Sequence, residues 1–373
     1  MDVHSNLAQL RAKRGLGAAQ LATAVGISRQ TVYAIEAGSY VPNTAVSLRL
    51  ARILDSTVEE IFSLESEQEP AETAEVIMLG NPASMQAGQP LRLCKVGGRT
   101  VAAAAEAGAW GLPPTDALLI APIRDGKRTA NAKVRIVGAG WDSAQRILLA
   151  GCDPSASILA SALQRQDCEL VIAFENSSRS LELLHEGLVH VAGTHLEEKP
   201  EGPGSVAAIT GMFPRNSVAV FSYAMWQEGL VIVRGNPKKI SGISDLARKN
   251  VLIANREPGA ACRILLDELL REHGITASSV KGYEREAPGQ LPAARLVQSG
   301  EVDCCVSTQA SATVLGLDFI PLARKPYRLV LRRKEMELAP IQALIETLGR
   351  ASFRREVEAC VGYEMRSSGD RLA

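Results

Sequence analysis

Over the first 62 residues, apolar positions recur every three or four residues, in short runs separated by polar turns. This spacing is typical of amphipathic helices. It predicts helices from Asn6 to Gly15, from Ala18 to Val25 and from Pro42-Asn43 onwards, with a last short helix from Thr57 to Phe62. With one more helix between the second and the fourth, the segment is predicted to be an all-α bundle of five helices.

The stretch from Gly26 to Gly38 predicts a tight turn followed by that remaining helix. Ser28 is a natural N-cap. Gly38 can adopt the left-handed backbone conformation with which helices commonly end. Val32 and Ile35 face inward, which leaves small polar, basic and aromatic side chains outside: Arg29, Gln30, Thr31 and Tyr33. A helix of this kind presents donors and acceptors to base edges in the major groove. The pattern therefore predicts that double-stranded DNA is a partner.

These residues, with the run from Leu10 to Leu16 and Tyr40-Val41-Pro42, resemble the Xre/Cro-type helix-turn-helix domains of bacterial regulators. The resemblance implies a homodimer that contacts two half-sites about 34 Å apart. We expect base contacts from Arg29 and Gln30. The other residues expected at the DNA are Arg11, Arg14, Ser28, Thr31, Tyr33, Tyr40 and Thr44.

One feature departs from that family. Gly17 and Ala18 stand where it usually has a polar N-cap and a glutamine. We therefore expect a weakly capped second helix. A helical bundle that mediates only protein contacts remains the alternative, because helix-turn-helix angles also occur outside DNA-binding proteins.

Charge supports DNA binding through its distribution and not through its total. The chain has 41 basic and 41 acidic residues, but residues 1–52 contain six Lys or Arg against two acidic residues. Residues 53–76 contain eight acidic residues and no basic one. A cationic segment suits the phosphate backbone. The acidic segment is predicted to be a solvated linker over residues 65–75.

Residues 76–143 are predicted to form a small β-rich subdomain. Polar and apolar positions alternate from Leu91 to Ala102 around Gly97-Gly98, which predicts a hairpin. Strict alternation from Lys133 to Gly138 predicts another strand. Either a spacer role or a dimer contact is compatible with this segment.

From about Arg146 the pattern changes to short, continuous apolar runs that alternate with helical segments. Such runs occupy residues 147–150, 170–174 and 188–192, and similar runs follow at 229–234, 251–254 and 302–307. Strands buried on both faces between helices indicate a parallel α/β sheet. A crossover near residues 205–230 divides the segment into two lobes. We place this domain at residues 144–365, after a first domain at 1–64, and treat 366–373 as a tail.

The second half resembles the type II periplasmic-binding-protein fold, and more narrowly the substrate-binding-like domain found beside helix-turn-helix domains and in some molybdopterin-biosynthesis proteins. The segments that carry the resemblance are Gly151–Pro154, Val191–Leu196, Gly235–Pro237, Asn255–Ala260, Gly282–Glu286 and Leu317–Leu322. The resemblance implies two lobes that close on a small ligand. It says little about which ligand binds.

Strand ends and helix starts supply the candidate ligand residues. They are Asp153, Ser155, Asn176, Ser177, Ser178, Arg179, Thr194, His195, Arg256, Gly259, Arg263, Ser307 and Thr308. Their hydroxyls and three arginines favour an anion, either an oxyanion such as molybdate or tungstate or a small organic anion. Asp153 would repel a doubly charged oxyanion unless it only caps its helix.

Other roles remain open for several of these side chains. A strand-end histidine such as His195 can also be satisfied by the backbone alone. Each of the three arginines could instead form a salt bridge or start a solvated helix. The seven cysteines lack the spacing of a zinc site, and no metal or cofactor is predicted. Redox or soft-metal sensing at Cys152 or Cys304-Cys305 is a minor alternative.

No apolar run reaches the length of a membrane span, and no signal-peptide pattern follows Met1. These features predict a cytoplasmic protein.

No Gly-x-Ser-x-Gly turn, phosphate-binding loop or dinucleotide fingerprint occurs, so no catalytic residue is predicted. The sequence favours a ligand-responsive transcriptional regulator. The alternatives are a molybdenum-cofactor enzyme with a regulatory head, and a metabolite-binding protein whose helical head serves dimerisation.

Overall fold

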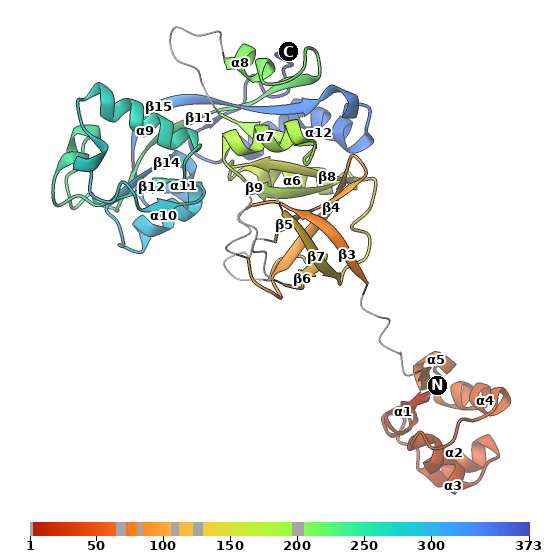
Figure 1. Ribbon diagram of the computed structural model, residues 1–373. Coiled ribbons are helices and arrows are strands. Elements are labelled where there is room, and N and C mark those ends of the chain that lie inside the picture. The colour runs from red at the N-terminus through yellow and green to blue at the C-terminus, as the bar shows by residue number, and fades with distance from the viewer. Residues whose placement is uncertain (1–2, 65–71, 81–84, 106–111, 122–129, 196–204) are drawn as a thin grey trace. The chain divides into compact units, whose positions relative to one another are not determined.

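The computed structural model describes residues 3–64, 72–80, 85–105, 112–121, 130–195 and 205–373 (Figure 1). The chain forms two compact units, Met1–Glu72 and Thr73–Ala373. In the described part, no helix is long and apolar enough to cross a membrane. The acidic linker predicted at residues 65–75 lies largely outside the described residues, and its last three residues belong to a strand.

The first unit is a bundle of five helices closed by a two-stranded ribbon. The helices are α1 (Leu7–Lys13), α2 (Ala18–Val25), α3 (Arg29–Glu36), α4 (Thr44–Leu54) and α5 (Val58–Ile61). Strand β1 (Val3–Ser5) pairs antiparallel with β2 (Phe62–Leu64). The core contains the inward positions of all five helices, among them Leu7, Leu21, Val32, Ile35 and Leu50. The five-helix prediction is confirmed.

Local capping explains where these helices begin. The Ser28 hydroxyl accepts a hydrogen bond from the Thr31 amide at 3.0 Å, and Asn43 and Thr57 cap α4 and α5 in the same way. The N-cap of α2 is Gly17, which offers no side chain. Instead, the Gln20 side chain accepts a hydrogen bond from the Gly17 amide at 2.7 Å. The weak cap expected for this helix is therefore partly offset by its own third residue.

The second unit begins with a closed five-stranded barrel. Its strands are β3 (Thr73–Met78), β4 (Pro90–Val96), β5 (Arg99–Ala104), β6 (Ala117–Leu119) and β7 (Ala130–Ile136), in the order β3-β5-β4-β6-β7. The predicted hairpin is β4–β5, and both glycines of its turn have positive φ, 56° at Gly97 and 81° at Gly98. The predicted β-rich subdomain is this barrel.

The α/β part consists of two lobes that share one mixed sheet. In the first lobe, β8 (Arg146–Gly151), β9 (Glu169–Phe174) and β10 (Val191–Thr194) are parallel, with α6 (Ala156–Gln164) and α7 (Ser177–Glu186) between them. In the second lobe, β12 (Ile253–Arg256), β13 (Glu286–Ala287) and β14 (Cys304–Thr308) are parallel. The helices of this lobe are η2 (Ile243–Ala247), α9 (Ala261–Glu272), η3 (Ala277–Ser279), α10 (Gln290–Gln298) and α11 (Gln309–Val314).

Two long strands join the lobes, and they add antiparallel pairs to the predicted parallel strands. Strands β11 (Val218–Ile232) and β15 (Asp318–Arg332) pair antiparallel from Val218↔Arg332 to Ile232↔Asp318. Figure 1 shows them running from one lobe into the other. Each also pairs antiparallel with a neighbour, β11 with β14 and β15 with β10. The apolar run predicted at residues 229–234 covers only the second-lobe end of β11.

The end of the chain returns to the first lobe. Helix α8 (Ser205–Gly211) precedes β11, and η4 (Arg333–Glu335), α12 (Ala339–Gly349) and α13 (Ala351–Glu358) follow β15. Strand β16 (Tyr363–Glu364) pairs with β11. Residues 366–373, predicted to be a tail, lie against the same strand, since Arg371 forms a bridge with Phe221. Two apolar clusters cover the faces of the first-lobe sheet, and two more fill the second lobe.

Candidate DNA-binding and ligand-binding sites

The outer face of α3 is exposed and polar, as predicted. Ser28, Arg29 and Gln30 are exposed, Thr31 is half-buried, and Tyr33 is 44% exposed. The Arg29 guanidinium donates to the Tyr33 hydroxyl at 2.9 Å, and its carbon lies 5.3 Å from the centre of the ring. This contact holds the basic group along the exposed face of the helix.

The predicted phosphate contacts divide into two groups. Tyr40 and Thr44 are exposed beside α3 and the start of α4, and the exposed Arg14 pairs with Asp55 at 3.0 Å. Arg11 instead lies mostly inside the bundle. Its guanidinium contacts Glu36 at 2.6 Å and the Leu16 carbonyl at 2.8 Å, which ties α1 to the end of α3. Arg11 thus helps to position α3, and its predicted contact with DNA stays a prediction.

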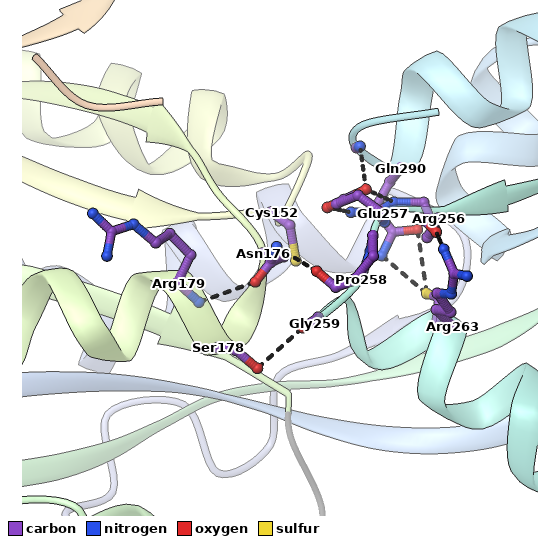
Figure 2. Close-up of polar contacts among 12 residues, drawn as sticks. Cys152, Asn176, Ser178, Arg179, Arg256, Glu257, Pro258, Gly259, Arg263 and Gln290 are labelled. Atoms are coloured by element: carbon purple, nitrogen blue, oxygen red, sulfur yellow. Dashed lines mark hydrogen bonds and ion pairs between the residues drawn. The ribbon is translucent and has the colours of Figure 1, made fainter. Parts of the chain in front are cut away.

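The ligand candidates of the second unit lie where the two lobes meet. Asn176 at the start of α7 donates from its amide to the Pro258 carbonyl at 3.3 Å, and Ser178 donates to the Gly259 carbonyl at 3.2 Å (Figure 2). Gly259 has φ +88°, and a side chain there would press against Asn176. The lobes are therefore in direct contact along the loop between β12 and α9.

Several predicted residues organise the loops around this contact. Asp153 accepts from the Ser155 amide and hydroxyl at 2.9 and 2.7 Å and from the Tyr363 hydroxyl, and burial raises its pKa. The Ser177 hydroxyl accepts from the His195 amide at 3.1 Å. Asp153 therefore holds the turn before α6, whose N-cap residue is Ser155, without itself capping the helix.

The remaining hydroxyl candidates are also held within the fold. The Ser307 hydroxyl donates to the Gln290 side chain at 2.8 Å. Thr308 caps α11 through the Ser311 amide. Thr194 is fully buried at the end of β10. All three lie beside the lobe contact.

Each of the three predicted arginines has a carboxylate partner. Arg179 pairs with Glu182 and Glu186 along α7, and Figure 2 shows it directed away from the lobe contact. Its place in the ligand site stays a prediction. Arg263 contacts Glu286 at 2.9 Å.

Arg256 is a buried cation at the start of the loop that contacts the first lobe, beside Glu257 and Pro258 (Figure 2). It is 2% exposed, and it forms two hydrogen bonds with Glu257, at 2.9 and 2.8 Å. Its Nη1 has no hydrogen-bond partner among the described residues. The Glu257 carboxylate outweighs the effect of burial and keeps the pKa of Arg256 raised. Arg256 therefore offers one free, charged donor inside the site.

His195 forms the centre of a second buried polar group. Its Nδ1 lies 2.5 Å from Glu228 Oε1, and its Nε2 lies 3.5 Å from Cys152 Sγ. Burial alone would lower the pKa of His195, but Glu228 and Cys152 raise it to about 10. The same pairing lowers the pKa of Glu228 against the effect of burial. His195 thus has a charged partner, in addition to the backbone contact considered from sequence.

Sequence reasoning missed Glu228, Glu257, Gln290, Trp226 and Tyr327. Glu228 carried a usable signal, because it is an isolated acidic residue in a long apolar stretch, and a buried charge needs a partner. Gly151 and Gly193 also had a reason to be glycine, since a side chain at either position would overlap the Tyr327 hydroxyl. Within the described residues, no group of three His, Cys, Asp or Glu is arranged to hold a metal ion.

Comparison with known proteins identifies both units. Residues 160–349, half of the chain, match the PBP superfamily domain, and residues 5–63 match a helix-turn-helix domain. The chain is 28% identical over 229 residues to the uncharacterized protein YvgK of Bacillus subtilis, a match that covers 61% of this chain and 74% of YvgK. Over 59 residues it is 41% identical to the uncharacterized HTH-type transcriptional regulator YgzD of the same organism, covering 16% of this chain and 89% of YgzD.

Among solved structures, an ABC-type phosphate transport receptor from Vibrio cholerae is similar, with 14% identity and a TM-score of 0.40. The match covers 58% of this chain and 98% of the receptor. A likeness this distant says nothing about the ligand of this chain.

Proposed function

Since the chain belongs to the PBP superfamily and carries the helix-turn-helix domain of HTH-type regulators, we propose that it is a one-component, ligand-responsive transcriptional regulator. The first unit binds operator DNA as a homodimer, and the two-lobed domain binds a small ligand. The observation that supports DNA binding most directly is the exposed polar face of α3, formed by Ser28, Arg29, Gln30 and Tyr33. Its exposure leaves these side chains available to base edges.

We assign base contacts to Arg29 and Gln30, and backbone contacts to Arg14, Tyr40 and Thr44. Arg29→Ala should relax sequence preference at one position of the operator and cost about 1–3 kcal/mol of binding there. Arg14→Ala should weaken binding to all DNA alike. Footprinting of the region upstream of its own gene, followed by titrations with operator and unrelated DNA, measures both effects.

Two results of these titrations would count against the assignment. Equal effects of the two variants on specific and unrelated DNA would refute the division into base and backbone contacts. The absence of any protected site at moderate salt would favour the dimerisation role of the helical head.

For the ligand, we propose a small organic acid whose anionic group accepts the free N–H of Arg256. The charges of the site support this class over a doubly charged oxyanion such as molybdate or tungstate. Arg256 pairs with Glu257 and His195 with Glu228, so the site holds little excess positive charge. A buried dianion needs several donors that are not already neutralised.

A thermal-shift panel tests the ligand class on the full chain. It contains small carboxylic acids, phosphate, sulfate, molybdate and tungstate, because a ligand that binds the folded state raises the unfolding temperature by mass action. The shift caused by an active compound should disappear in Arg256→Gln combined with Glu257→Gln, a pair that preserves neutrality. It should persist in the matched control Arg179→Gln, whose side chain points away from the site.

Regulation requires that the ligand change operator affinity. We expect a coupling of about 1–3 kcal/mol, a 5- to 150-fold change in the dissociation constant for operator DNA. Titrating operator DNA with and without a compound that gives a thermal shift measures this coupling. Ligand binding with no change in DNA affinity would favour the metabolite-binding alternative.

A further inference from the structure

Three side chains from three strands form a line within the buried region between the lobes. Cys152 follows β8, His195 follows β10, and Glu228 lies within β11. The Cys152 sulfur lies 3.5 Å from His195 Nε2, and His195 Nδ1 lies 2.5 Å from Glu228 Oε1. The Trp226 indole donates to the same carboxylate oxygen at 3.1 Å and helps to fix it. A nucleophile, an imidazole and an orienting carboxylate in this order are the elements of an activated thiol.

The protonation state of His195 suits this activation. With its pKa raised to about 10 by Glu228 and Cys152, the ring is an imidazolium at neutral pH and has a proton on both nitrogens. Nδ1 contacts Glu228 as an ion pair without hydrogen-bond geometry, and Nε2 faces the Cys152 sulfur. A cationic donor in contact with the sulfur also supplies a proton to the group that leaves when the sulfur attacks.

Arg256 supplies an independent observation from the other lobe. Its guanidinium interacts electrostatically with Cys152, and its buried Nη1 lacks a hydrogen-bond partner within the described residues.

Access to the thiol restricts the reactant. Cys152 is 6% exposed. A side chain this buried favours a small, uncharged reactant over a large or charged one. We propose that Cys152 is a peroxide-reactive thiol, activated by His195 and Glu228, through which hydrogen peroxide modifies the ligand-binding domain.

The reaction balances with groups that are present. The thiolate of Cys152 attacks one oxygen of hydrogen peroxide, so that an S–O bond forms while the O–O bond breaks. Sulfur is oxidised to sulfenic acid, and the peroxide is reduced. The departing hydroxide takes the Nε2 proton of His195 and leaves as water.

The other cysteines provide internal references. Cys94, Cys262, Cys304 and Cys305 are buried, and burial raises the pKa of each thiol. Cys360 is more exposed than Cys152. If exposure alone decided the rate, Cys360 would react first, whereas the proposal requires that Cys152 react first.

Peptide-resolved mass spectrometry of the full chain tests this order. The protein is treated with hydrogen peroxide at neutral pH in the presence of dimedone, which traps sulfenic acid. Cys152 should be labelled at least about tenfold faster than Cys360. His195→Gln should slow labelling of Cys152 by about 10²-fold, because it removes the proton donor for the leaving group. The exposed His273→Gln is the matched control and should change neither rate.

Two outcomes would overturn the proposal. One is labelling of Cys152 no faster than that of Cys360, or unaffected by His195→Gln. The other is rapid alkylation of Cys152 by iodoacetamide without oxidation by peroxide, which would show a reactive thiol that does not use peroxide. A rate for Cys360 that is unchanged in His195→Gln shows that this variant remains folded. The labelling rates do not depend on DNA or on the organic ligand. A result that contradicts the peroxide proposal would therefore not contradict the proposed regulator function.

Discussion

His195 and Glu228 illustrate how much a single buried pair can determine in this protein. Both side chains lie almost entirely out of solvent, where either charge alone would be costly. They coexist because imidazolium and carboxylate neutralise each other at 2.5 Å. The same pair fixes the side of the histidine ring that faces Cys152.

The pair predicts a specific dependence of stability on pH. The pKa of His195 is about 10 in the folded chain and near its ordinary value of 6.5 when unfolded. The stability from this group is therefore fully present below pH 6.5 and is lost progressively as pH rises to about 10. Glu228→Gln removes the charge that raises the pKa of His195. Its free energy of unfolding should fall less steeply than that of the unmodified protein over this range.

Urea titrations of both proteins at several pH values measure the difference. Because lysines, tyrosines and thiols also titrate above pH 8, the comparison uses the difference between the two slopes. Identical slopes between pH 6.5 and 10 would show that Glu228 does not control the protonation of His195.

At the scale of elements, local caps and close packing set the helices and strands that carry the candidate sites. Helix α3 begins at the Ser28 cap and is held at its other end by the Arg11–Glu36 ion pair. Strand β10 passes directly under Tyr327, where only glycine leaves room.

Ser28→Ala should loosen the start of α3. It removes the acceptor for the Thr31 amide, a loss of about 1 kcal/mol, which corresponds to about fivefold faster exchange of the first amides of the helix. Hydrogen exchange of the full chain measures this, and Ser28→Asp, which keeps an acceptor, should restore slow exchange. Equal exchange in all three proteins would mean that the cap does not stabilise the helix.

Gly193→Ala should destabilise the first lobe, because a methyl group at this position overlaps the Tyr327 ring and hydroxyl. Overpacking of a rigid core costs about 1–3 kcal/mol. Gly349→Ala, at the end of α12, is the matched control, since a methyl group there meets no atom within 4 Å. Denaturant unfolding should separate the two variants, and equal stabilities would contradict this packing argument.

On the scale of the whole molecule, a buried ionic network attaches the barrel to the α/β sheet of the second unit. Arg146 at the start of β8 contacts Asp116 at 2.7 Å and donates to the Leu93 carbonyl at 2.9 Å. Asp116 also accepts from the Leu93 amide and from Arg92. Arg146 also pairs with Glu169 of its own sheet at 2.7 Å, so the contact with Asp116 links an ion pair of the sheet to an ion pair of the barrel.

Arg146→Met should destabilise the second unit by about 3 kcal/mol, because it leaves Asp116 buried with only Arg92 as a charged partner. Adding Asp116→Asn to this variant should recover part of the loss, since no buried carboxylate then remains. Denaturant unfolding of the single and double variants measures the recovery. A double variant less stable than Arg146→Met alone would show that packing of these side chains, and not the pairing of their charges, stabilises the second unit.

The sequence by itself determined mainly features that depend on local patterns. Helix α3 follows from Ser28, the inward Val32 and Ile35, and the terminating Gly38. The hairpin follows from Gly97-Gly98, and the alternating apolar runs predict the parallel strands of both lobes. These features depend on residues close together in the chain, where helical period, capping and glycine conformation act directly.

Only the tertiary structure decided which charges face the site. Arg179 and Arg256 look alike in sequence and both are buried, yet Arg179 pairs along its own helix while Arg256 keeps a buried Nη1 without a hydrogen-bond partner in the described part of the chain. The line of Cys152, His195 and Glu228 joins residues separated by up to 76 positions, and the long strands β11 and β15 bring the lobes together from distant segments. Partners far apart in the chain leave no spacing signal, because the contact arises only when the sheet is assembled.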